Sequence, residues 1–133
     1  LTNLTGLFLS KNQISDLTPL QGLTNLTKLY LPTNQIIDLT PLHGLTSLMW
    51  LWLYANCISD LGPLLNLPGP TYLYIDSNPL SDDAINVQIP QLESNGVSVK
   101  YSTYSDDGCA GSEGEDKPTE SKLTQVESSE ETN

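Results

Sequence analysis

Leucines recur in a fixed pattern from residue 1 to about residue 80. Residues 1–22, 23–44 and 45–66 align without a gap, and each segment is 22 residues long. Within each segment, leucines alternate with other residues, as in LFL, LYL and LWL, and this alternation predicts a short strand. Alternate residues of a strand point to opposite faces, so we expect the leucines to face a shared core and their neighbours to face solvent. The 22-residue period predicts a stack of similar coils.

Two polar features recur with the same period. An asparagine follows each predicted strand, and we expect its amide to satisfy backbone groups of the turn; these residues form a predicted structural ladder of Asn12, Asn34, Asn56 and Asn78. In the DLTPL sequence, the threonine before proline predicts an N-cap, with proline in the first position of a short helical turn. One aspartate also recurs per unit, which indicates turn stabilisation rather than catalysis, at Asp16, Asp38 and Asp60.

The repeat pattern changes in its fourth unit, residues 67–80, where Pro70 replaces the second leucine. Ser81 is expected to cap a helix that Pro90 breaks or kinks. A second short turn should end at Gly96, and the sequence VSVKY predicts a strand at 97–101. Because the last coil of a solenoid would otherwise expose its leucines, we expect residues 81–101 to form a C-terminal cap.

The two ends of the chain carry different information. Leu1 opens a repeat in full register, so we expect further repeats upstream in the intact protein. Residues 102–133 carry two lysines and nine acidic residues, and they account for −7 of the net charge of −11. Their low apolar content predicts a disordered acidic tail or linker. This charge argues against nucleic acid as a partner, and without a long apolar run we expect no membrane insertion.

The first three units match the pattern L-x-x-L-x-L-x-x-N-x-L in full, and the chain therefore resembles the leucine-rich repeat family. The wording NQISDLTPL is similar to the 22-residue bacterial, internalin-like class. The resemblance covers residues 1 to about 101, as a C-terminal fragment with its cap. It implies an α/β leucine-rich repeat solenoid, with short parallel strands on the concave face and short helical turns on the convex face. It also favours a secreted or cell-surface bacterial protein, although no L-P-x-T-G anchor motif occurs.

The residues that alternate with the leucines fall into three columns, and seven of the nine aromatic residues of the chain lie there. One interpretation is structural, because aromatic residues suit strands and stack across neighbours. The other is functional, because tryptophan and tyrosine concentrate binding energy at protein interfaces. A cluster three columns wide favours the functional interpretation. The predicted partner-binding residues are Phe8, Lys28, Tyr30, Trp50, Trp52, Tyr54, Tyr72 and Tyr74.

These features favour a protein–protein interaction module that binds its partner through an aromatic concave surface. Two alternatives stay open: a carbohydrate-binding surface, and the structural end of a longer repeat array that binds its ligand elsewhere. We expect no enzyme, cofactor or metal site, because the motifs that such sites require are missing from the sequence. His43 is expected to be an exposed substitution. Cys57 lies in a repeat and Cys109 in the acidic segment, and their positions do not favour a disulfide.

Overall fold

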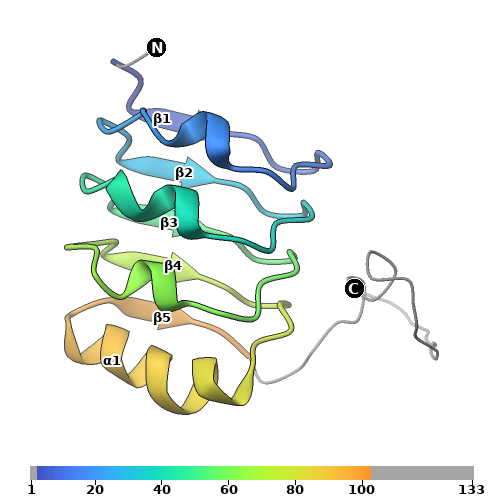
Figure 1. Cartoon of the computed structure of the whole chain (residues 1–133), viewed down its shortest axis with the longest axis vertical. Helices are drawn as coiled ribbons and strands as arrows, with labels where there is room; N and C mark the ends of the chain where they lie inside the picture. Colours follow the sequence, from blue (N-terminus) through green and yellow to red (C-terminus); the bar gives the residue numbers. More distant parts are fainter. Residues whose placement is uncertain (1–2, 103–133) are drawn as a thin grey trace.

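The computed structural model describes residues 3–102, which form a stack of coils with a sheet along one side (Figure 1). Five short strands form one parallel sheet in chain order. They are β1 Gly6–Phe8, β2 Lys28–Tyr30, β3 Trp50–Trp52, β4 Tyr72–Tyr74 and β5 Ser98–Lys100. Leu7 pairs with Leu29, and Leu29 with Leu51, so the sheet register equals the sequence period. The predicted solenoid of parallel strands is confirmed.

Short 3₁₀ helices connect the first four strands and cover the other side of the coils in Figure 1. They are η1 Thr18–Leu20, η2 Thr40–Gly44 and η3 Gly62–Leu64. Between the sheet and these helices lies the core, in which central-strand leucines such as Leu29 and Leu51 are completely buried. The leucine period therefore fills the interior of every described coil.

The predicted threonine N-cap is wrong. The residue before η1 is Leu17, and it makes no side-chain cap hydrogen bond, while Thr18 is already helical. Instead, Asp16 Oδ1 accepts a hydrogen bond of 2.9 Å from Thr18 N. Asp38 and Asp60 accept the equivalent bonds at 2.9 and 3.0 Å. An aspartate side chain can accept a hydrogen bond from the backbone N–H two residues ahead, so it satisfies the first helical N–H and no threonine cap is required. The expected turn-stabilising role of these aspartates is confirmed.

The asparagine side chains join successive coils along the loops that follow the strands. Asn34 Oδ1 accepts hydrogen bonds from the backbone N–H groups of Asn12 and Ile14 in the preceding coil, at 3.1 and 3.0 Å. Its amide nitrogen donates to the carbonyl oxygens of Leu9 in that coil and Leu31 in its own coil. Asn56 and Asn78 repeat this arrangement and are almost fully buried. Buried backbone groups of two coils thus share one side chain.

A continuous helical segment follows the fourth coil. Ser81 Oγ accepts a hydrogen bond of 3.0 Å from Ala84 N, as its predicted capping role requires. A π-helix, η4 Ala84–Gln88, leads directly into α1 Ile89–Ser94. The segment continues past Pro90, so the predicted break is wrong. Pro90 stands where the π-helix changes to the first turn of α1, a position at which a missing N–H is tolerated. Gly96 then turns the chain with a φ of 95°, and the strand expected at 97–101 is β5.

The helical segment is fixed to the third coil by a buried glutamine. Gln88 Oε1 accepts a hydrogen bond of 2.7 Å from Leu61 N, and Gln88 Nε2 donates one of 2.8 Å to Asp60 Oδ1. Ile89 and Leu92 are 1% exposed and belong to the same core as the leucines of the coils. These contacts support our proposed division into repeats at residues 1–80 and a cap at 81–101. The acidic segment proposed for 102–133 lies, beyond residue 102, outside the described residues.

Candidate binding surface

Aromatic side chains project from the solvent side of the sheet. In β3, Trp50 and Trp52 are partly exposed and flank Leu51, which is completely buried. The strand alternation that turns the leucine inward therefore turns both tryptophan rings outward. Because adjacent strands are in register, outward residues of successive coils lie side by side.

The central column of this surface is a continuous row of four rings, joined by three contacts in chain order. Phe8 meets Tyr30 edge to face, with ring centroids 4.4 Å apart and planes at 85°. Tyr30 and Trp52 are stacked at 4.3 Å and 8°. Trp52 meets Tyr74 edge to face at 5.1 Å and 83°. Both geometries are the ones that aromatic quadrupoles favour, so the rings hold one another in place.

The flanking columns widen this row. On one side, Trp50 and Tyr72 are stacked with centroids 6.2 Å apart, and Lys28 Nζ lies 5.2 Å from the centre of the Trp50 ring. On the other side, the Tyr54 ring lies 6.3 Å from that of Tyr74. We call the whole surface the aromatic face, made up of Phe8, Lys28, Tyr30, Trp50, Trp52, Tyr54, Tyr72 and Tyr74. The structure brings together all eight residues that the sequence predicted for this surface.

The rings of the aromatic face are not equally accessible. Phe8, Tyr72 and Tyr54 are 59%, 47% and 37% exposed and stand at its edges. The inner rings of Tyr30 and Trp52 are only partly exposed, because they stack on their neighbours. The face thus combines a rigid centre with exposed apolar edges, an arrangement typical of interaction sites on proteins.

One polar residue at the border of the aromatic face is not among the predicted binding residues. Asp76 follows β4 in the outward column of Tyr54, and the hydrogen bond from Ala55 N to Asp76 O places the two coils side by side there. Its Oδ1 atom is buried, and it has no hydrogen-bond partner within the described residues. The alternation of outward positions identifies the residue, but the sequence gives no signal that one of its oxygens is buried.

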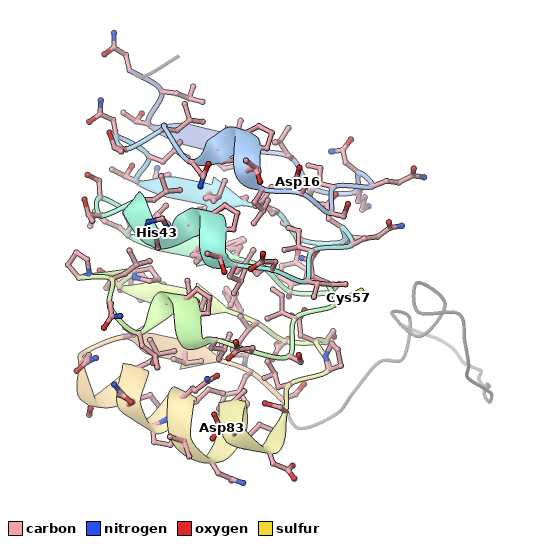
Figure 2. The ribbon with its side chains drawn as sticks, in the orientation of Figure 1. Asp16, His43, Cys57 and Asp83 are labelled. Carbon is pink, nitrogen blue, oxygen red and sulfur yellow. The ribbon has the colours of Figure 1, made fainter. Side chains whose placement is uncertain are left out.

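The remaining candidates lie away from the aromatic face. His43 is exposed, as predicted, and its Nδ1 lies 2.9 Å from Thr40 O. Figure 2 shows His43 and Asp16 on the helical side of the coils. Hydrogen bonds from the Thr18 side chain and backbone hold the pKa of Asp16 below its usual value. These bonds stabilise the turn, as the recurrence of the aspartate predicted.

Cys57 is disulfide-bonded, which the positions of the two cysteines in the sequence did not favour. It is buried at the loop edge of the third coil (Figure 2). Cys109, the second cysteine of the chain, lies outside the described residues.

Within residues 3–102, no group of three histidine, cysteine, aspartate or glutamate side chains could hold a metal ion. No helix there is long and apolar enough to cross a bilayer.

Comparison with known proteins gives a family match and structural matches. A family model described as leucine-rich repeats, two copies, matches residues 2–44. The crystal structure of internalin C2 from Listeria monocytogenes is similar at 39% identity and a TM-score of 0.64, over 76% of this chain and 45% of that chain. An internalin, InlF, from the same species is similar at 25% identity and a TM-score of 0.64, over 76% of this chain and 35% of that chain. The chain thus spans less than half the length of either structure. No curated protein sequence gives a significant match.

Proposed function

The chain belongs to the leucine-rich repeat family, with internalin-like repeats, and on that basis we propose that it is a protein–protein interaction module. Families of this kind consist generally of non-enzymatic binding modules. The proposed contact surface is the aromatic face. The observation that carries the proposal is the continuity of its rings on the solvent side of one sheet. Five rings form one unbroken chain of contacts, from Phe8 through Tyr30, Trp52 and Tyr74 to Tyr54, and Trp50 and Tyr72 stack as a second pair beside it.

The physical reason is that these rings are ordered before a partner arrives. Binding normally costs free energy to fix mobile side chains, about 0.5 to 1.5 kcal/mol for each flexible side chain. Trp52 is already held between Tyr30 and Tyr74, at 4.3 and 5.1 Å. Apolar ring surface is therefore available for burial at a small entropic cost, which favours Trp50 and Trp52 as the residues with the largest contributions to affinity.

We extend the proposal to a secreted or cell-surface bacterial protein. The likeness to Listeria internalins supports this location. The disulfide at Cys57 is independent support, because disulfides persist in oxidising compartments outside the cytosol.

Carbohydrate binding through ring stacking is the second candidate. The stacked Trp50–Tyr72 pair favours it, because its planes are within 7° and sugars bind flat aromatic surfaces. Sugar sites also need polar side chains beside the rings. Here the polar groups beside the rings are limited to Lys28, Asp76 and the tyrosine hydroxyls, so few are available to the hydroxyl groups of a sugar. Binding to a glycan array that is lost with Trp50→Ala would favour this candidate over the first.

The test is a screen of purified extracellular protein domains against the immobilised chain, followed by biolayer interferometry on each hit. We expect the Trp50→Ala/Trp52→Ala variant to raise Kd about 100-fold or more, because two central aromatic anchors are removed. The matched control is Ile37→Ala/Val87→Ala, which truncates two residues that are 51% and 53% exposed outside the sheet. Equal affinities of the two double variants would contradict the proposed surface.

A further inference from the structure

A buried carboxylate oxygen at the border of the aromatic face needs an explanation. Asp76 Oδ1 is buried, and it accepts no hydrogen bond from any described residue. An unsatisfied buried polar atom destabilises a fold, so such atoms are rare and often serve a ligand. Here the atom belongs to the acidic residue of the outward columns, at the position that Tyr54 occupies one coil earlier.

Two tyrosines occupy the outward positions next to Asp76. Tyr54 stands in the same column one coil earlier, and Tyr74 stands two residues before Asp76 in the next column; their rings are 6.3 Å apart and inclined at 73°. A carboxylate at an outward position between two aromatic positions suits a cation, which can gain an ion pair and cation–π contacts together. Lys100 is the nearest lysine in register, because it pairs with Tyr74, but it donates no hydrogen bond to Asp76 Oδ1.

We infer that Asp76, Tyr54 and Tyr74 form a subsite for an arginine side chain of the protein partner. This inference rests on the proposed function, because it names the chemistry of the partner at one end of the aromatic face. Arginine fits better than lysine, since its planar guanidinium stacks on tyrosine and pairs with both oxygens of a carboxylate. A partial rotation about the broad terminal torsion of aspartate turns the plane of the carboxylate, so that both oxygens can face the ligand.

The charge of the chain agrees with a basic partner. The described coils and cap carry three lysines and seven acidic residues, and the whole chain has a net charge of −11. Lys28 stands over Trp50 in the column farthest from Asp76, whereas Lys100 is exposed and in register with Tyr74, so Lys100 is the lysine that an incoming cation meets at this end of the face. Asp76 offsets the charge of Lys100, and the partner is expected to place its arginine against the carboxylate.

The experiment titrates the complete, disulfide-intact chain with Nα-acetyl-arginine methylamide and follows backbone and tyrosine signals by NMR. Its neutral counterpart, Nα-acetyl-citrulline methylamide, has the same shape without the charge. We expect saturable shifts around Tyr54, Tyr74 and Asp76 with the arginine compound, and affinity at least fivefold weaker for citrulline. Asp76→Asn should weaken arginine binding at least fivefold, because it removes the charge and keeps the shape. The matched control, Asp82→Asn on the exposed start of the cap, should leave it unchanged.

Three results would overturn the subsite. These are no saturable binding of the arginine compound, shifts centred away from the three named residues, and a loss smaller than fivefold in Asp76→Asn. The titration uses no protein partner, so its failure is distinguishable from failure of the screen that tests the aromatic face.

Discussion

The first and second coils have almost the same leucine pattern but very different burial. In the second coil, Leu26, Leu29, Leu31, Ile36 and Leu42 are all completely buried. Their counterparts 22 residues earlier are only partly buried, and these are Leu4, Leu7, Leu9, Ile14 and Leu20. The second coil has a neighbour on each side, whereas β1 pairs only with β2.

The difference shows that a residue of a solenoid takes its stability from the coils beside it. The leucines of one coil cannot enclose one another, so the coils on either side must cover the apolar surface that these leucines leave open. The same logic applies to polar groups, because Asn34 serves the backbone of the preceding coil as well as its own. Identical residues at equivalent positions should therefore differ in energetic importance, and paired substitutions can measure this difference.

The largest effect is expected for the central strand leucines. Leu29→Ala should destabilise the fold by about 3 kcal/mol, because it leaves a cavity between two coils. Leu7→Ala should cost about 1 kcal/mol, because the side chain is partly exposed before the substitution. Urea denaturation followed by circular dichroism gives both values. Equal losses would mean that neighbouring coils do not determine the contribution of a leucine.

The asparagines should show the same contrast with a somewhat smaller effect. Asn56→Ala should cost about 2 to 3 kcal/mol, because it leaves the buried Ile36 N–H and Leu31 C=O without their side-chain partner. Asn12→Ala should cost less than about 1 kcal/mol, because the bonds from Asn12 to Leu9 O and Ser10 O are exposed. The same denaturation experiment tests this pair. A larger loss for the first coil than for the third would contradict the ladder as described.

The aspartates of the first and third coils should differ in their response to pH. Hydrogen bonds from the Gln88 side chain and then from Gly62 N lower the pKa of Asp60, whereas those on Asp16 come from Thr18 within the same turn. A lowered folded pKa stabilises the fold above the ordinary aspartate pKa, and this contribution is lost as pH falls through the lowered value. Gln88→Ala should raise the pKa of Asp60 and leave that of Asp16 unchanged, as measured by NMR titration of the carboxyl carbons. An unchanged Asp60 pKa would show that the cap does not act on this coil.

The smallest effect concerns the turn after each strand. One non-glycine residue per coil has a left-handed backbone conformation there, with φ between 57° and 60°, at Lys11, Thr33, Ala55 and Ser77. Threonine is the worst suited of these, because its β-branch clashes in that region. Thr33→Asn should stabilise the fold by about 1 kcal/mol, and Lys11→Asn by less. A loss of stability in Thr33→Asn would indicate that the threonine makes a compensating contact.

The periodic features of the fold could be predicted from the sequence because each repeats at the same spacing. Leu51 between Trp50 and Trp52 decides which residues are buried and which are outward, and the structure agrees. The short turns with their aspartates were also predictable. The sequence could not show that Asp16, rather than Thr18, would bond the first helical N–H. Both residue types cap helices, and only the backbone geometry selects one of them.

The features that escaped prediction occur once and depend on contacts between distant residues. Gln88 forms hydrogen bonds with Leu61 and Asp60, which lie 27 and 28 positions earlier in the sequence, and no repeated motif predicts these two bonds. The disulfide of Cys57 and the buried oxygen of Asp76 likewise do not recur from one described coil to the next. A pattern identifies positions that share an environment, whereas a unique contact requires the folded chain.

The most direct test of the aromatic face as a binding surface is the free energy of unfolding of the Trp50→Ala/Trp52→Ala variant. Rings on the solvent side of the sheet contribute through stacking, at about 0.5 to 1.5 kcal/mol for each pair in addition to the area that they bury. The two tryptophans take part in three ring pairs, so we expect cooperative urea unfolding of a variant that still folds, with a loss of no more than about 5 kcal/mol. A loss well beyond it, or the absence of a folded state, would mean that the tryptophans hold the coils together rather than serve a partner.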